Sequence, residues 1–512
     1  MRRHALAAVA LGLSLSACGS TVQLSSTTTT SDGLGGSSTS GTGLDGSTSG
    51  TTGGFDGSSS GTGGTGLGST GGSSTSGSTG AVLPGTSTSG SGTSGSTTGV
   101  IGGSTGSSGG AKSPVEVGIV VFPDVSQFSA SLGSSSGNAG NQEAMVERMI
   151  GYINAHGGLA GHKVKSVVHS VSLTSTESYA QIEQEVCTDF TQDHHVIAAL
   201  TVGANVDNYL PDCLRKKGVL YLGGGHYLHD ETDFRQLPNM VMPGEVSMSR
   251  LAKAMISEMF ARGVLKSGQK LGMLVEDHPA ALRATNNILR PQLKARGVTL
   301  VDYTIKGPSS TPDIANSVSA IQSAELKMAT QNVAAVSFLC AGCFSFFLSD
   351  AESQGYYPRY FLHSIDNLGA IAGKNHAQSM KNAIALGFDP IRDVGIFTHK
   401  TAITGNPSYD LCTTIMKGFV TDDTSAGLTK VVCGGYLDLF EAAKNLKGAP
   451  LNGTNLMSGF NAFGRSHSSA VNIATEINAN RHDGTYGYRT MHYNAASDAL
   501  VYDSNALHAF AE

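Results

Sequence analysis

Two cysteines with a spacing used in redox and metal sites occur in the tetrapeptide Cys340-Ala341-Gly342-Cys343. A thioredoxin-like role requires such a pair at the start of a helix, where the thiol pKa is lowered. A zinc site requires two further ligands at comparable spacing, and the chain has no second Cys-x-x-Cys. We therefore favour a short-loop disulfide at this position and expect no metal.

Histidines and carboxylates gather in the stretch "HYLHDETD", which contains His226, His229, Asp230, Glu231 and Asp233. These are metal-ligand types, but no strand or helix pattern fixes their spacing, and we expect a solvated loop. The folded part has no G-x-x-x-x-G-K-[ST] loop and no G-x-S-x-G between a strand and a helix. We predict a protein that is not an enzyme, with no cofactor and no catalytic residues.

The N-terminal stretch "MRRHALAAVALGLSLSAC" begins with two arginines and continues as an apolar run. The run is shorter than the ~20 residues that cross a bilayer. Leu15-Ser16-Ala17-Cys18 matches the lipobox of bacterial lipoproteins, which are cleaved before the cysteine and carry diacylglycerol on its sulfur. We predict a signal peptide over residues 1–17 and a lipid anchor on Cys18, with the protein on the extracytoplasmic side of the cell membrane. The alternative is an ordinary secretory signal in which Cys18 is accidental.

A long segment after Cys18 consists almost entirely of Gly, Ser and Thr. It cannot bury enough apolar surface to offset its conformational entropy, so we predict a disordered tether over residues 18–112. A flexible chain of this length has a root-mean-square reach of roughly 50 to 60 Å. The globular part therefore begins near residue 113.

The cysteine content and the net charge indicate where the protein works and which partners it does not bind. The globular part has an even number of cysteines, as expected of an exported protein with disulfides. The simplest pairing joins sequence neighbours, although other connectivities are possible; the pairs would be Cys187 with Cys213, Cys340 with Cys343, and Cys412 with Cys433. The formal net charge is −6 and the globular part has no Lys/Arg run, which argues against a nucleic-acid partner.

Short apolar runs alternate with helical patterns through the globular part. A first series predicts strands at 115–122, 163–170, 196–202 and 219–225, with helices near 145–153, 179–190 and 207–217. A second series begins with a helix at 248–263 and predicts strands at 270–277, 299–306, 333–340 and 359–365. Residues from about 382 to 483 show helical patterns, and 487–504 predicts a closing hairpin. The fold class is α/β, with two doubly wound lobes built on parallel sheets.

The connector "INAHGGLAGHKVKSVVHS" joins the first predicted helix to the second predicted strand. Gly157 or Gly158 suits the left-handed position after a helix, and Gly161 suits the turn into the strand, so we interpret this segment as scaffold. It closely resembles the connector after the first helix of type 1 periplasmic binding proteins, in particular the branched-chain amino-acid-binding (Leu/Ile/Val-binding) group. The order of the neighbouring segments is similar over residues 113–512.

The resemblance implies two α/β lobes joined by a multi-segment hinge, with a ligand held in the cleft between them. Lobe 1 would comprise 113–241 and 386–485, and lobe 2 would comprise 242–385 and 486–512. It also implies a first-lobe disulfide of about the span of Cys187 and Cys213. The Cys340–Cys343 loop would line the mouth of the cleft.

The resemblance also indicates which loops of this chain lie at the positions of the family's ligand-binding loops. In lobe 1 they contain Gly203, Ala204, Asn205, Gly224, Gly225 and His226. The chain departs there from the family's usual Ser/Thr pair, so leucine-like specificity is not transferred to it. In lobe 2 they contain Asp277, His278, Phe344 and Asp366, the last where branched-chain binders place an acid that meets the ligand ammonium.

The sequence thus predicts an extracytoplasmic solute-binding lipoprotein that acts as the receptor of an ABC-type importer. Its partners would be a small polar solute, such as an amino acid or an amide, and a membrane permease, with the chain acting as a monomer. A first alternative is a sensory or accessory binding lipoprotein without a transporter. A second is an exported hydrolase or thiol-redox protein with Cys340 and Cys343 as its reactive pair.

Overall fold

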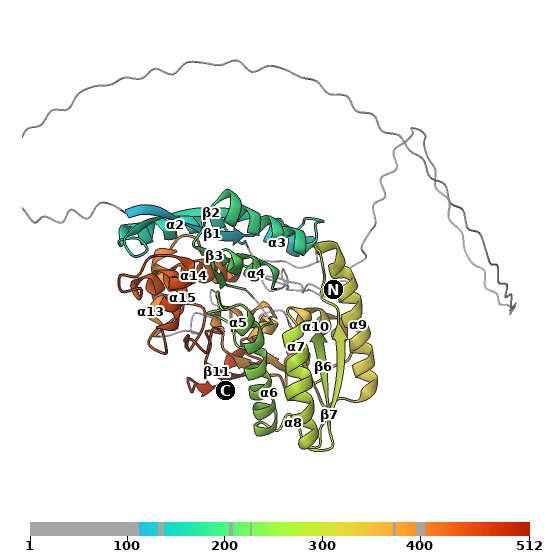
Figure 1. Cartoon of the computed structure of the whole chain (residues 1–512). Helices are drawn as coiled ribbons and strands as arrows, with labels where there is room; N and C mark the ends of the chain where they lie inside the picture. The colour runs from blue at the N-terminus through green and yellow to red at the C-terminus, as the bar shows by residue number, and fades with distance from the viewer. Residues whose placement is uncertain (1–111, 132–137, 204–207, 226–227, 372–374, 396–404) are drawn as a thin grey trace, which may run out of the picture. The chain divides into compact units, whose positions relative to one another are not determined.

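The computed structural model describes residues 112–131, 138–203, 208–225, 228–371, 375–395 and 405–512 (Figure 1). The predicted signal peptide, the lipidation site Cys18 and almost all of the predicted tether lie outside these ranges. Within them, no helix has both the length and the apolar character needed to cross a membrane.

The first sheet has five parallel strands in the order β2-β1-β3-β4-β5. Its strands are β1 (Lys112–Val121), β2 (His162–Ser170), β3 (Ala198–Thr201), β4 (Leu220–Gly223) and β5 (Met240–Val241). The first four strands lie where the sequence predicts them. The strand order reverses between β1 and β3, and ligands of open parallel sheets sit beyond the carboxyl ends of the strands at such a reversal.

Helices cover both faces of this sheet. Its crossover helices are α2 (Gln142–Ala155), α3 (Tyr179–Thr188), α4 (Tyr209–Lys216) and α5 (Glu231–Gln236), with η2 (Asp189–Asp193) continuing α3 and α1 (Val125–Ser131) following β1. The predicted apolar stripe of α2 is fully buried at Met145, Met149 and Ile153. The chain later returns to this sheet, where α14 contacts α2 and α15 contacts β4 (Figure 1, orange). The returning helices are α13 (Pro407–Ile415), α14 (Asp423–Lys444) and α15 (Gly453–Asn461).

A second sheet system follows in the chain. Three strands run in the order β7-β6-β8, and a parallel bridge between Val336 and Tyr360 connects them to β9, which continues as β9-β10-β11-β12. The strands are β6 (Lys270–Glu276), β7 (Thr299–Ile305), β8 (Ala335–Leu339), β9 (Phe361–His363), β10 (Ile384–Gly387), β11 (Gly487–Asn494) and β12 (Ala499–Tyr502), and β13 (His508–Ala509) pairs with β11. Here the order reverses between β6 and β8. The predicted strands and the antiparallel closing hairpin β11–β12 are confirmed.

Helices and short helical turns connect these strands. The longer ones are α6 (Met248–Ala261), α9 (Ile314–Gln331) and α10 (Cys343–Ser353). The segment after β6 folds as α7 (Pro279–Ala284), η3 (Thr285–Leu289) and α8 (Arg290–Ala295). The short elements are η4 (Thr311–Asp313), η5 (Ser364–Asp366), η6 (Leu368–Ile371), α11 (Ala377–Met380) and α12 (Pro390–Asp393). The helical interpretation of the third block is wrong at its start, because Ile384–Gly387 forms β10, which pairs with β9 and β11.

The connector between α2 and β2 has the predicted conformation. Gly157, Gly158 and Gly161 all have positive φ, at 100°, 72° and 87°. A Cβ on Gly158 would lie 1.9 Å from the His162 carbonyl oxygen, which only glycine avoids. The Gly158 N–H donates to the Ile153 carbonyl at 2.9 Å and ends the helix. The connector therefore serves the fold.

Candidate functional site

The carboxyl edge of the first sheet is closely packed. A Cβ on Gly203, just past β3, would lie 2.3 Å from the Phe122 ring, just past β1. A Cβ on Gly224, just past β4, would lie 2.5 Å from the Thr201 carbonyl oxygen and from the Val431 side chain on α14. Both glycines are thus required for close approach, independently of any ligand. Gly225 is buried beside Gly224, whereas Ala204, Asn205 and His226 lie outside the described residues.

A buried ion cluster holds the Gly224 loop against the segments that connect the two sheets. Arg392 on α12 lies 2.8 Å from Glu245 and 3.0 Å from Asp389, and its guanidinium donates to the Gly224 carbonyl at 3.5 Å. Burial raises the pKa of Glu245 against the effect of the arginine. Glu245 precedes α6, and Arg392 follows β10. The cluster therefore joins two connecting segments to a predicted ligand loop.

Further contacts make these connecting segments a continuous hinge region. Met242 and Asp483 form a parallel bridge, and the Thr485 N–H donates to the Glu245 carbonyl at 3.0 Å. The Arg250 guanidinium donates to the Asp483 carboxylate at 2.6 Å, and both side chains are buried. The segments around 242–247, 388–395 and 481–486 thus lie beside one another. None of these side chains was singled out from the sequence, because their partners are distant along the chain.

The carboxyl edge of the second sheet presents a buried acid. Glu276 is 3% exposed, its Oε2 accepts the Ala341 N–H at 3.2 Å, and its Oε1 has no partner among the described residues. Burial raises the pKa of Glu276 to about 8, against the effect of the Ala341 hydrogen bond, with a further rise from Asp277. Glu276 is therefore protonated at neutral pH. The sequence prediction named its neighbour, Asp277, and missed this residue.

The two predicted residues after Glu276 differ in exposure. Asp277 is exposed, and its N–H donates to the Ile305 carbonyl at 2.7 Å. His278 is buried and caps α7, where its Nδ1 accepts the Ala280 N–H at 3.3 Å. The His278 ring lies 6.1 Å from the His229 ring, centroid to centroid. His278 thus faces a residue that follows the first sheet's β4.

The other two predicted second-lobe residues lie in the interior. Phe344 is fully buried, with ring centroids of both Phe338 and Tyr360 at 5.4 Å. Asp366 is 1% exposed and ends η5, which directly follows β9, and its Oδ2 accepts the His363 N–H at 2.8 Å. Its Oδ1 has no partner among the described residues, and burial raises the pKa of Asp366 well above its usual value. In this arrangement burial disfavours the charged form of Asp366, which is the form that would meet a ligand ammonium group.

The expected solvated loop in "HYLHDETD" is wrong over its described residues, 228–233. Asp230 is the N-cap of α5, and Asp230 and Asp233 are each 2% exposed. Their counter-charge is Arg283 on α7, whose Nε donates to Asp230 Oδ2 at 2.6 Å and whose Nη2 donates to Asp233 Oδ2 at 2.9 Å. Burial opposes ionisation of Asp230, but the hydrogen bonds and charge of Arg283 outweigh it and leave the pKa of Asp230 below its usual value.

The ion pair of Arg283 with Asp230 and Asp233, here called the latch, joins the crossover helices of the two sheets. A second contact between the sheets lies elsewhere, where Ser178 and Ser310 form an antiparallel bridge and the Thr311 hydroxyl donates to the Leu173 carbonyl at 2.7 Å. The loops of the two sheets therefore touch directly. No group of three or more metal-ligating side chains occurs in the part of the chain that the structure describes.

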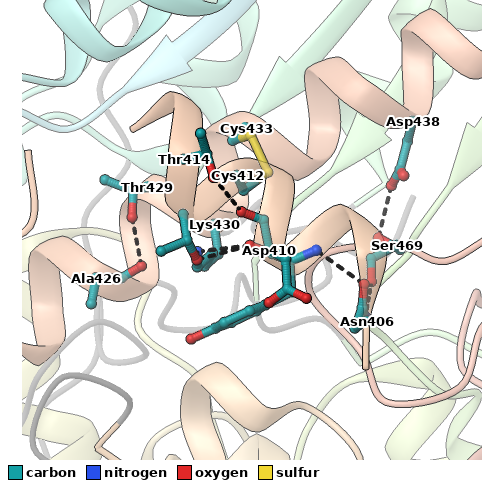
Figure 2. Close-up of a disulfide and its surroundings, with 12 residues drawn as sticks. Asn406, Asp410, Cys412, Thr414, Ala426, Thr429, Lys430, Cys433, Asp438 and Ser469 are labelled. Carbon is teal, nitrogen blue, oxygen red and sulfur yellow. Dashed lines mark hydrogen bonds between the residues drawn. A yellow bond between two sulfur atoms is a disulfide. The ribbon is translucent and has the colours of Figure 1, made fainter. Parts of the chain in front are cut away.

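All three disulfides join sequence neighbours, as the sequence favours: Cys187–Cys213, Cys340–Cys343 and Cys412–Cys433. Figure 2 shows Cys412 and Cys433 joining α13 to α14, with Lys430 on α14 beside them. The Lys430 ammonium lies 3.9 Å from the Tyr409 ring centroid and donates to the Tyr409 carbonyl at 3.1 Å. Burial lowers the pKa of Lys430 to about 8, against the effect of the Asp410 charge. This disulfide fastens the returning helices.

Similarity to known proteins is found at the level of structure. No protein-family model matches the chain, and no curated protein matches it. A leucine-binding protein from Thermotoga maritima superposes with a TM-score of 0.52 at 10% identity, over 77% of this chain and 98% of that one. A solute-binding protein of an ABC transporter from R. palustris, in complex with 4-hydroxybenzoate, gives 0.55 at 9% identity, over 78% and 98%. A fatty acid ABC transporter substrate-binding protein from Thermomonospora curvata gives 0.51 at 10% identity, over 77% and 92%.

Proposed function

We propose that this chain, which has the two-lobe α/β fold of type 1 periplasmic binding proteins, is an extracytoplasmic solute-binding receptor of an ABC-type importer. The observation that supports the proposal is the extent of the shared fold, which spans 98% of the leucine-binding protein. Both strand-order reversals, β1/β3 and β6/β8, provide the kind of edge at which such sheets hold ligands. The solute would bind between these edges, and the lobes would close by motion at the hinge region.

The proposed lobes follow the sequence prediction. Lobe 1 comprises 113–241 and 386–485, and lobe 2 comprises 242–385 and 486–512; β10, at the boundary, pairs within the second sheet. Gly203, Gly225, Asp277 and His278 are the described residues that we propose at or next to the ligand. We further propose that Cys18 carries the lipid anchor and that the chain acts as a monomer with a permease. The ligand that we propose is a small polar solute, such as an amino acid or an amide.

A thermal-shift screen of the purified chain tests this function. The panel contains amino acids, amides, aromatic acids, fatty acids, sugars and nucleosides. A ligand at about a hundred times its dissociation constant adds about 2.7 kcal/mol of stability, which raises the melting temperature measurably. Asp277→Ala should weaken the response to the active class. Asp193→Ala is the matched control, because Asp193 is an exposed acid that precedes β3 and lies at the opposite edge of the first sheet.

The screen distinguishes solute binding at the sheet edges from binding elsewhere and from no solute binding. A shift confined to one chemical class, reduced by Asp277→Ala and unchanged by Asp193→Ala, supports a receptor that binds at the sheet edges. Equal responses of the two variants would place the ligand elsewhere. No shift with any compound would contradict solute binding and favour a role with a protein partner.

A further inference from the structure

The Cys340–Cys343 disulfide lies where the strand order of the second sheet reverses. The parallel register of β6 and β8 ends with Val275 opposite Leu339. Glu276 and Cys340 each follow that last pair by one residue, on neighbouring strands. The buried carboxyl group and the disulfide loop therefore share one edge of the sheet.

Glu276 is a buried acid directed at this loop. Its Oε2 accepts the N–H of Ala341, the residue after Cys340, at 3.2 Å. Its Oε1 has no partner among the described residues although the side chain is 3% exposed. The raised pKa leaves a proton on Glu276 at neutral pH. A buried acid with an unused oxygen beside a disulfide loop is not required by solute binding.

Cys343 occupies the first residue of α10, and Gly342 is its N-cap in the left-handed conformation, with φ of 71°. The N-terminus of a helix stabilises a thiolate, so the pair meets the positional requirement for a redox role. The other disulfides lack this placement. Their cysteines lie near the carboxyl end of α3 (Cys187) or inside α4, α13 and α14 (Cys213, Cys412 and Cys433).

We propose that Cys340–Cys343 is a reducible disulfide that accepts electrons from a dithiol, and that Glu276 donates the proton that Cys340 requires. One thiolate of the dithiol attacks Cys343 Sγ, which belongs to the more exposed residue of the pair, 4% against 0%. The S–S bond breaks, and Cys340 leaves as a thiolate and takes the Glu276 proton. This redox activity goes beyond the proposed solute binding and does not depend on it.

A second thiol–disulfide exchange completes the transfer of two electrons from the dithiol to the cysteine pair. The second thiolate of the dithiol attacks the dithiol's first sulfur, which is bonded to Cys343 Sγ in the mixed disulfide. Cys343 then leaves as a thiolate at the helix N-terminus. The dithiol loses two electrons and becomes a disulfide, and the two cysteines gain these electrons. The protons released by the two dithiol groups restore Glu276 and protonate Cys343.

The fold tolerates this opening better than it would tolerate loss of the other bridges. Cys340 and Cys343 are separated by three positions, against 26 for Cys187–Cys213 and 21 for Cys412–Cys433. A shorter loop removes less entropy from the unfolded chain, so its disulfide adds less stability than the other two. Reduction would release the Ala341–Gly342 turn at the proposed ligand edge while the lobes remain folded.

Partial reduction of the native full chain by dithiothreitol tests the proposal. Samples are quenched with acid at intervals, alkylated and digested, and mass spectrometry quantifies each cysteine pair. Cys412–Cys433 is an internal control of similar burial, because both of its residues are 0% exposed, against 0% for Cys340 and 4% for Cys343. We expect Cys340–Cys343 to open at least about tenfold faster than this control, with the melting transition retained. Equal rates for the two pairs would overturn the proposal.

The variant Glu276→Gln removes the acidic proton of Glu276 but keeps a side-chain oxygen that can accept the Ala341 N–H. It therefore tests proton donation separately from the structural role of this hydrogen bond. We expect reduction of Cys340–Cys343 to slow by about a hundredfold near neutral pH and its dependence on pH between 6 and 9 to change. Reduction of Cys412–Cys433 should be unaffected. An unchanged rate in this variant would refute the role of Glu276. The solute screen is read independently, so failure of either proposal leaves the other testable.

Discussion

Arg283 on α7 donates from Nε to Asp230 Oδ2 at the start of α5, at 2.6 Å, and so joins the crossover helices of two separate sheets. Asp230 is buried and Arg283 is about one-third exposed, with side-chain exposures of 3% and 31%. The pair is consequently neither a solvated surface contact nor a fully enclosed one. Asp233 supplies a second carboxylate to the same guanidinium at 2.9 Å. The latch is thus an ion pair between the two lobes that lies outside the hinge region.

Removing the latch should destabilise the chain. Arg283→Ala leaves Asp230 and Asp233 buried without their cation, and we expect a loss of about 2 kcal/mol in the free energy of unfolding. Arg290→Ala is the matched control, because Arg290 forms a single ion pair with Asp302 and is 47% exposed. Its effect should stay below about 1 kcal/mol. Urea denaturation measures both, and equal losses would contradict a special role for Arg283.

The latch should also weaken in acid. The pKa of Asp230 is below its usual value in the folded protein, so its ionised form is favoured by folding. The resulting stabilisation is fully present above the unfolded pKa of about 3.9 and is lost as pH falls through the lower folded pKa. The stability difference between the wild type and Arg283→Ala should therefore shrink between about pH 4 and pH 2. A difference that stays constant over this range would contradict the assigned ion pair.

Glu276 should give the opposite dependence on pH. Its folded pKa of about 8 lies above its unfolded value, so the folded state holds an extra proton between the two values. The contribution of Glu276 to the free energy of unfolding is therefore highest below its unfolded pKa. It falls as pH rises toward 8, with a slope of at most about 1.4 kcal/mol per pH unit. Glu276→Gln cannot ionise. It should gain stability relative to the wild type as pH is raised from 5 to 8, as measured by urea denaturation at each pH.

Gly203 should not accept a side chain. The Cβ of Gly203→Ala would lie 2.3 Å from the Phe122 ring, which is itself buried, so the loop or the ring must move. We expect a loss of about 1 to 3 kcal/mol. Gly427→Ala is the control, because nothing lies within 4 Å of its Cβ position inside α14. That substitution should gain up to about 1 kcal/mol from helix propensity. Matching losses would show that Gly203 is not constrained by packing.

The Cys187–Cys213 bridge should contribute strongly to stability. Its sequence separation of 26 predicts a stabilisation of about 3.5 kcal/mol from the entropy of the unfolded chain. The double variant Cys187→Ala/Cys213→Ala should lose about that amount in urea denaturation, whereas Cys340→Ala/Cys343→Ala should lose less. The reverse order would contradict the loop-entropy argument that underlies the proposed tolerance to reduction.

Local sequence patterns determined the elements and their class. The apolar runs of β1 and β3 and the stripe of Met145, Met149 and Ile153 are visible in the sequence because strand and helix periodicity are set by nearest neighbours. Gly158 is equally visible, since a left-handed residue after a helix requires little besides glycine. The prediction is wrong at Ile384–Gly387 because a run of only four residues, three of them buried, carries no period that separates a strand from a helix.

Only the tertiary structure decided which side chains meet. The sequence identified Cys340, Cys343 and Asp277, but it did not identify Glu276, whose carboxyl reaches the cysteine loop across a strand pair. No sequence pattern indicates the ion pair of Arg283, because the acids that it binds lie some fifty positions earlier, in another lobe. Asp366 was placed at the end of its strand by its position in sequence, yet its ionisation depends on burial. Charge pairing and solvation depend on three-dimensional neighbours, and periodicity along the chain does not encode them.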